Sequence, residues 1–465
     1  MHAIDFALIA VYLVFLLFLG LRGKHQVGNI TDLILDGRRL TLPAFTMSLV
    51  STWYGGILGV GEYSYNYGIS NWLVFGVPYY VAALLFAFLI SKRARTLQLV
   101  TIPGRLAEVY NRKTALAGAV IVFMMTVPAS YILMMGVLGT QFFNWPLWAG
   151  VIFGALFSLL YIYFGAFRSV VITDKIQFSV MFAGFILMFV ILVSKFGGWE
   201  FLKGHLPDSH FTWHGGNSGW YIATWYFIAL QTLIDPAFHQ RAYAAKSESV
   251  AFKGIFFSIL CWMVFDFLST SCGLYSRAIL PDLTNAAESY PALAQEVLPP
   301  GLLGLFSVTM LSIIMGTIDS YSFLAASTFG NDIIPRLKKV SEQQIIKLTK
   351  LGLFVSAGLS IVWALFFQSA VDIWYAFGSI GTPALLIPLV STFAGKRRIP
   401  ARWAFISIIL SGMTSLVWFI SKSFSADSKF WLGIEPIFSG LLVSLLIYLI
   451  FAKPIQVENL QQSRS

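Results

Sequence analysis

The chain has 465 residues, of which 57% are hydrophobic and 11% are charged, and its formal net charge is +10 at pH 7. Soluble domains carry charges on about a quarter of their residues, so this composition excludes a soluble protein and predicts an all-α, polytopic membrane protein. The loops are too short for a catalytic domain, and no G-x-x-x-x-G-K-[ST] phosphate loop is present. We therefore expect neither an enzyme nor direct use of ATP.

Apolar runs of the length needed to cross a bilayer, about 20 residues, recur along the whole chain. We predict about thirteen transmembrane helices, which begin near Ala3, Thr41, Trp72, Ala115, Trp145, Ser169, Gly219, Val250, Gly301, Leu348, Ala370, Ala401 and Leu432. The predicted parts are an N-terminal anchor helix with a cytoplasmic loop (1–40), a five-helix repeat (41–197), an extracellular loop (198–218), a second, inverted five-helix repeat (219–395), and two C-terminal helices with a short cytoplasmic tail (396–465).

The positions of lysine and arginine predict the orientation, because cytoplasmic loops carry an excess of both. With the N-terminus outside, five of the 31 basic residues face outward, which leaves 26 on the cytoplasmic side. We expect a multi-pass protein of the plasma (inner) membrane with a cytoplasmic C-terminus. The positive charge then indicates this topology and attraction to anionic membrane lipid. It does not indicate nucleic-acid binding, and the chain gives no sign of an obligate protein partner.

The second predicted span contains the segment 51–56, Ser-Thr-Trp-Tyr-Gly-Gly. Adjacent glycines among aromatic and hydroxyl side chains predict a break in the helix, whose carbonyl groups would become oxygen ligands. The alternative is that Gly55 and Gly56 permit close packing of helices. Glu62 follows on the outward side, where it either lines an entry vestibule or lies in the aromatic belt of the interface.

Asp174 begins a later span and is followed directly by Lys175. The neighbouring lysine permits a structural ion pair. Hard cations prefer oxygen ligands with negative charge nearby, so Asp174 is also a candidate for an ion site together with Asp319.

Asp235-Pro236 predicts a second broken helix at the start of the second repeat. Proline removes an amide donor, and a carboxylate at membrane depth is a functional hypothesis by default. The alternative is a proline kink in which the Asp235 side chain satisfies the freed backbone. Two broken helices in corresponding positions predict a binding site between them at the midplane. Arg241, further along the second of them, is interpreted as a positive-inside anchor.

A third group of polar residues follows one face of a later span at spacings i, i+3, i+4 and i+7. It consists of Ile313, Gly316, Thr317 and Ser320, with Asp319 beside the stripe. The hydroxyls either bond to neighbouring helices or, with the adjacent carboxylate, hold an ion. Asp266, in another span, has no predicted role.

Four segments of the chain resemble the sodium/solute symporter family in order and spacing. They are 35–40 (LDGRRL), 165–177 (GAFRSVVITDKIQ), 240–247 (QRAYAAKS) and 316–320 (GTIDS) followed by 325–328 (AAST). The resemblance implies the leucine-transporter-type fold, a five-plus-five inverted repeat with broken helices 2 and 7. It also implies the import of sugars, amino acids, carboxylates, vitamins or similar solutes, driven by a sodium gradient.

The resemblance implies site residues as well. The main Na⁺ site takes carbonyls from Ser51, Tyr54 and Ile313 and hydroxyls from the positions of Gly316 and Thr317, where Gly316 replaces the usual serine. A possible second ion site takes Asp174, Asp319 and Ser320. The solute cavity lies between the broken helices, with Trp53, Gly55, Gly56 and Asp235 facing it and Glu62 near its mouth, and it favours a neutral or cationic solute over an anion.

We therefore predict a secondary active transporter that imports a small organic solute with Na⁺ by alternating access. Three alternatives stay open. Like charges in a low-dielectric site favour protonation of one carboxylate, so H⁺ is the alternative coupling ion. A transporter-like sensor and an uncoupled channel are the others. No metal site other than that for Na⁺ is predicted.

Overall fold

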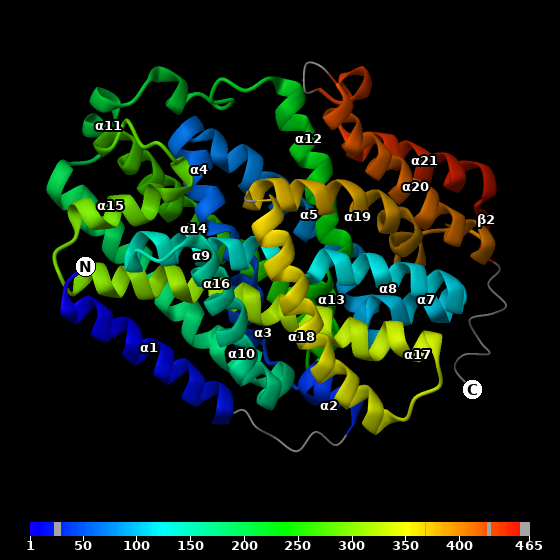
Figure 1. The fold of residues 1–465 in the computed structure, drawn as a ribbon. Coiled ribbons are helices and arrows are strands. Elements are labelled where there is room, and N and C mark those ends of the chain that lie inside the picture. Colours follow the sequence, from blue (N-terminus) through cyan, green and yellow to red (C-terminus); the bar gives the residue numbers. More distant parts are fainter. Residues whose placement is uncertain (23–28, 368, 426–428, 456–465) are drawn as a thin grey trace.

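The computed structural model describes residues 1–22, 29–367, 369–425 and 429–455 as a bundle of helices (Figure 1). The last ten residues of the predicted cytoplasmic tail lie outside this part. The only strands in it are β1 (Arg397–Arg398) and β2 (Lys453–Pro454), which pair antiparallel. The helices are α1 (Ala3–Arg22), α2 (Ile30–Leu35), α3 (Leu42–Trp53), α4 (Ile57–Tyr67), α5 (Val77–Phe86), α6 (Lys92–Thr96), α7 (Ile102–Val109), α8 (Arg112–Thr126), α9 (Ala129–Phe143), α10 (Leu147–Phe196), α11 (Trp199–His205), α12 (Gly219–Ala229), α13 (Pro236–Ala244), α14 (Glu248–Ile279), α15 (Ser289–Val297), α16 (Leu302–Ser327), α17 (Ile334–Leu337), α18 (Glu342–Phe367), α19 (Ala370–Phe393), α20 (Ala401–Ser421) and α21 (Pro436–Phe451).

Nine helical segments of the described residues are long and apolar enough to cross a membrane. The predicted number of about thirteen stays a prediction. Several predicted spans fall below the length needed for a crossing because turns divide them, as in α3 with α4 and in α12 with α13, and α21 has only 16 residues. Conversely, α10 has 50 residues, which is about 75 Å of straight helix and far exceeds a hydrocarbon core of about 30 Å.

The first predicted break is present as one tightened turn. Helix α3 ends at Trp53, a 3₁₀ turn follows at Tyr54–Gly56, and α4 begins at Ile57. The backbone angles of Gly56 (φ −75°, ψ 17°) stay close to helical values. The chain therefore does not unwind here. The end of α3 still leaves last-turn carbonyls without the usual partners of an α-helix.

The second predicted break is deeper. A 3₁₀ turn at Leu230–Ile234 leads to Asp235 in extended conformation (φ −66°, ψ 121°), and α13 begins at Pro236. Proline suits the first helical position because the amide donor it lacks would have no partner there. The carboxylate of Asp235 caps this helix by accepting from the amides of Ala237 (2.7 Å) and Phe238 (3.2 Å). Its side chain thus satisfies backbone groups that the break frees.

The described chain has two further interruptions, of which the first was not predicted. Val127 and Pro128 separate α8 from α9, and Pro128 has non-helical angles (φ −80°, ψ 39°). Within α10, Ala166 has φ 51° and ψ −151°, which is a conformation that disfavours side chains. This residue divides the 50-residue helix at the boundary between the predicted spans that begin near Trp145 and Ser169.

The two broken helices run in opposite directions. The amide of Leu40, just before α3, donates to the carbonyl of Ala244 at the end of α13 (3.1 Å), and the amide of Lys246 donates back to Leu40 (2.9 Å). The start of α3 thus lies beside the end of α13. This is the antiparallel relation that an inverted repeat requires.

Helix α16 lies near the middle of the bundle, with α20 and α21 at its edge (Figure 1). Every residue from Phe306 to Ser327 is buried. The first helix is fixed to α16 by Asp5, whose Oδ1 accepts from the amides of Gly301 (2.7 Å) and Gly304 (2.8 Å). The polar stripe predicted on α16 is therefore enclosed by protein and not by lipid.

Gly68 ends α4 in a conformation that only glycine adopts easily, with φ 61° and ψ −134°. A Cβ atom there would lie 2.2 Å from the backbone oxygen of His210. We expect Gly68→Ala to cost about 1–3 kcal/mol and to lower the melting temperature in detergent. Gly204→Ala, on a glycine of α11 with nothing within 4 Å of the added carbon, is the matched control. Equal melting temperatures for the two variants would contradict this expectation.

Candidate functional site

The two breaks face a cavity of about 150 Å³. Both contribute to its lining, Trp53, Tyr54 and Gly56 from the first and Asp235 with Pro236 from the second. Twelve of its twenty-four lining residues are aromatic: Trp53, Tyr54, Phe75, Tyr79, Tyr80, Tyr131, Trp225, Trp262, Tyr321, Trp374, Tyr375 and Phe377. The cavity is the place at which a small solute would contact both repeats.

The predicted solute residues divide into two groups. Trp53, Gly56 and Asp235 line the cavity. Gly55 instead packs against α16, since a Cβ atom there would lie 2.2 Å from Thr317 Oγ1. Glu62 on α4 is half-buried, lies about two turns beyond Gly55, and is not among the lining residues. For all five, a role in solute binding stays a prediction.

Asp235 joins the cavity to α16. While Oδ1 caps α13, Oδ2 accepts a hydrogen bond from the hydroxyl of Tyr321 (2.8 Å). The ring of Tyr321 lies 5.6 Å from that of Tyr131, and Tyr131 lies 5.9 Å from Trp374. Both carboxylate oxygens of Asp235 thus accept hydrogen bonds, one from backbone amides of α13 and the other from a side chain of α16.

Asp266 is a second cavity carboxylate, for which no role was predicted. It lies on α14, is 4% exposed, and accepts hydrogen bonds from the hydroxyls of Tyr54 and Tyr80, one to each oxygen. No cationic side chain of the described residues forms an ion pair with it. A carboxylate in the middle of an apolar span was the signal in the sequence that could have indicated a functional role. Its tyrosine partners, however, are far away in sequence.

The stripe on α16 meets the end of α3. Thr317 donates its hydroxyl to the carbonyl of Thr52 (2.6 Å), and the carbonyl of Ser51 is 3.5 Å away. Gly55 and Gly316 allow this approach because neither carries a side chain. A cluster of oxygen atoms from two repeats therefore lies at this contact, in a fully buried place.

Gly316 leaves room for two other oxygens. A Cβ atom at this position would lie 2.5 Å from Ser51 Oγ, 3.0 Å from Gln177 Oε1 and 3.3 Å from the Ser51 carbonyl. Both side-chain oxygens are buried and have no hydrogen-bond partner among the described residues. Gln177, which sequence reasoning did not select, thus faces the position at which the family's usual serine is missing.

Arg241 is the hub of the polar network, so its interpretation as an interfacial anchor was wrong. Its side chain is fully buried and lies 3.4 Å from Asp174 Oδ2. The guanidinium also donates to Ser48 (3.1 and 3.2 Å), Thr52 (2.8 Å) and Ser320 (2.7 Å). Ser48 in turn donates to Asp174 (2.5 Å). Lys175, the neighbour considered as the partner of Asp174, is exposed.

The predicted second ion site is therefore divided. Asp174 and Ser320 both contact Arg241, whereas Asp319 Oδ2 accepts from the hydroxyl of Tyr161 on α10. Ser158 and Gln177 face the same carboxyl, yet Asp319 Oδ1 has no hydrogen-bond partner in the described part of the chain. Asp319 is fully buried and has no cationic partner there.

A family model, that of the sodium:solute symporter family, matches residues 33–411. The sodium/proline symporter of Staphylococcus aureus is 23% identical over 96% of this chain and 92% of its own length. The sodium/pantothenate symporter of Haemophilus influenzae is 26% identical over 52% of this chain. The sodium-dependent multivitamin transporter of Oryctolagus cuniculus is 25% identical over 82% of this chain. The matches span 53% and 65% of the lengths of the latter two relatives.

Two solved structures share the fold. A Na⁺-coupled sialic acid symporter in a substrate-bound outward-open state has a TM-score of 0.80 at 18% identity, over 98% of this chain and all of that one. A nucleobase-cation-symport-1 family transporter has a TM-score of 0.57 at 12% identity, over 90% of this chain and 95% of that one. The predicted all-α inverted-repeat architecture of the leucine-transporter type is confirmed.

Proposed function

Because this chain belongs to the sodium:solute symporter family, we propose that it imports a small organic solute together with Na⁺ by alternating access. It is a multi-pass membrane transporter and not an enzyme, and sodium is the coupling ion of its family. The observation that carries the proposal is the buried contact of α3 with α16, where oxygens of both repeats gather beside the cavity.

The proposed Na⁺ ligands are the carbonyls of Ser51, Tyr54 and Ile313 and the hydroxyl of Thr317. Gly316 removes one expected hydroxyl, and we assign its place to Ser51 Oγ and Gln177 Oε1, which point to this position without a partner. Hard cations require an oxygen shell of this kind. The site thus keeps its oxygen ligands although the usual serine is absent.

Tyr54 is the proposed link between ion and solute. Its backbone belongs to the Na⁺ site, while its hydroxyl donates to Asp266 on the cavity wall. A ligand drives a conformational change only through its different affinity for the two states. Since one residue contacts both sites, an ion that fixes the α3–α4 turn also fixes the solute-binding carboxylate.

We assign no second Na⁺ to Asp174 and Ser320. The guanidinium of Arg241 lies between them and supplies a positive charge in a fixed position. A cation bound at this place would meet a like charge at contact distance. The proposed stoichiometry is therefore one Na⁺, bound between α3 and α16, for each solute.

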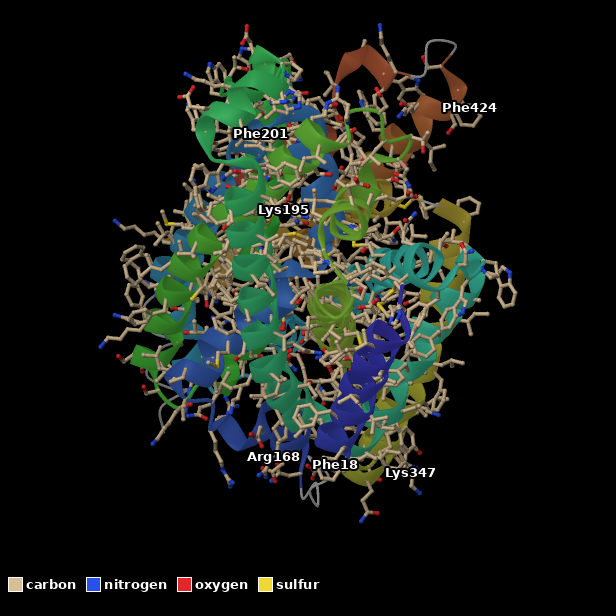
Figure 2. The ribbon with its side chains drawn as sticks, turned by 90° about the vertical axis from the view of Figure 1, so that its left-hand side faces the viewer. Phe18, Arg168, Lys195, Phe201, Lys347 and Phe424 are labelled. Atoms are coloured by element: carbon tan, nitrogen blue, oxygen red, sulfur yellow. The ribbon has the colours of Figure 1, made fainter. Side chains whose placement is uncertain are left out.

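The proposed orientation places the N-terminus outside in the plasma membrane. Arg168 and Lys347 lie toward the same end of the molecule, whereas Phe201 and Phe424 lie toward the other (Figure 2). With basic residues on the cytoplasmic side, the end with Arg168 and Lys347 is cytoplasmic.

Proton coupling is the second candidate, and Asp319 favours it. A fully buried carboxylate without a cationic partner or a second hydrogen-bond donor is costly to keep charged. A proton bound to Asp319 would remove that cost. Because Asp319 lies where α16 contacts α10, a rearrangement of this contact would change the affinity for the proton. Asp319 lies outside the proposed Na⁺ shell, so the two ions are not exclusive.

The test uses the whole protein in proteoliposomes with a defined mixture of metabolites, read by mass spectrometry. An inward Na⁺ gradient is expected to accumulate at least one solute above its external concentration, and replacement of Na⁺ by K⁺ is expected to abolish this. Accumulation driven by a pH gradient without Na⁺ would support H⁺ instead. Equilibration without accumulation would indicate an uncoupled channel and overturn the proposal.

A further inference from the structure

The cavity combines negative charge with aromatic rings. Asp235 and Asp266 line it, and no lysine, arginine or histidine does so in the described parts of the chain. An anionic solute would meet two carboxylates in a buried place. No lysine, arginine or histidine of the described residues forms an ion pair with either carboxylate, so the balance of charge favours a solute that is itself positive.

The two carboxylates differ in how far positive charge and dipoles of the protein offset their negative charge. Asp235 caps the N-terminus of α13, where the helix dipole favours negative charge, and Arg241 lies less than two turns further along the same helix. The carboxylate of Asp266 accepts hydrogen bonds only from the hydroxyls of Tyr54 and Tyr80 among the described residues. Each carboxylate oxygen accepts two hydrogen bonds, so Asp266 keeps acceptor capacity on both oxygens.

Aromatic rings line the same cavity as this carboxylate. Trp262 precedes Asp266 by one turn of α14, and its ring lies 5.6 Å from Trp53, which lies 5.2 Å from Tyr79. Rings of this kind attract ammonium groups through their negative faces. The protein's own lysines and arginines lie over other rings, such as Phe252 and Phe167, and none of those found within the described residues covers a cavity ring.

We propose that the transported solute carries a positively charged nitrogen, which binds between the carboxylate of Asp266 and the rings of Trp53 and Trp262. The proposal rests on the proposed function and specifies its substrate class. The cavity of about 150 Å³ has room for roughly five water molecules, so the solute is small. A compact amine or quaternary ammonium compound satisfies both the size and the charge.

The first experiment compares charge at constant shape. The purified wild-type protein is melted in saturating NaCl with choline, with ethanolamine, with tetramethylammonium and with 3,3-dimethyl-1-butanol, the neutral carbon analogue of choline. At least one cation is expected to raise the melting temperature, and the neutral analogue is not. Equal stabilisation by choline and its neutral analogue, or stabilisation by none of the cations, would overturn the proposal.

The second experiment removes the charge and keeps the shape. Asp266→Asn is expected to weaken the binding of the stabilising cation by roughly tenfold or more, while the increase in melting temperature caused by NaCl over KCl persists. Asp372→Asn, which removes an exposed carboxylate of α19, is the matched control and leaves both unchanged. Unchanged cation affinity in Asp266→Asn would contradict the assignment.

The two proposals fail in different ways. If NaCl does not raise the melting temperature of the wild-type protein above its value in KCl, the proposed function is contradicted, whatever the solute. A persistent Na⁺ effect with Na⁺-driven uptake of only neutral or anionic solutes contradicts the inference about charge and leaves the symporter intact.

Discussion

Arg241→Gln is expected to destabilise the protein by about 3–5 kcal/mol, because it leaves the carboxylate of Asp174 buried without a counter-charge. Both side chains are fully buried, and the same guanidinium holds Ser48, Thr52 and Ser320. The substitution therefore removes one cation and at least three hydrogen bonds that join α3, α10, α13 and α16. Thermal melting of the detergent-solubilised protein, read by fluorescence-detected size exclusion, measures the loss.

The control for this prediction is the double variant Asp174→Asn with Arg241→Gln. It removes both charges at once, so no unpaired buried ion remains. The double variant is therefore expected to melt at a clearly higher temperature than Arg241→Gln alone. A double variant no more stable than Arg241→Gln would show that the ion pair is not the cause. A single variant as stable as the wild type would contradict the central place given to Arg241.

Local chemistry predicted where the broken helices lie. The Gly55-Gly56 pair and the Asp235-Pro236 pair interrupt a helix through their own backbone properties. Both breaks can therefore be predicted from the sequence without knowledge of any long-range contact. Pro128 carried a similar signal that went unused. Ala166 carried none, because nothing in an alanine indicates that tertiary packing will hold it at φ 51°.

The partners of the site residues were beyond the sequence. The stripe of Thr317 and Ser320 follows from helical spacing, but what it faces depends on which helices meet. Asp174 and Arg241 are 67 positions apart, and Tyr54 and Asp266 are 212 apart. The role of Arg241 was misjudged for this reason. An arginine near the end of a span is usually an interfacial anchor, and it is the packing of α3, α10 and α16 around α13 that encloses this one.

The proposed Na⁺ site and the proposed solute site share the first broken helix. The same short stretch gives backbone oxygens toward α16 and side chains toward the cavity, with Trp53 among the rings and Tyr54 on Asp266. Occupation of one proposed site is therefore expected to change the order of the groups that form the other. Coupling between ion and solute is expected to be lost more readily by changes at this stretch than by changes elsewhere in the cavity wall.

Thr317→Ala is expected to raise the Na⁺ concentration for half-maximal stabilisation by roughly tenfold or more, equivalent to about 1.4 kcal/mol. The hydroxyl lies at the carbonyls of Ser51 and Thr52. It is the one hydroxyl of α16 among the proposed Na⁺ ligands, since position 316 is glycine. The measurement is the difference in melting temperature between NaCl and KCl. Thr317→Ser keeps the hydroxyl and loses only the methyl group, so it retains the Na⁺ response. If the alanine and serine variants lose stability equally in both salts, Thr317 serves packing alone, and the ion must bind elsewhere.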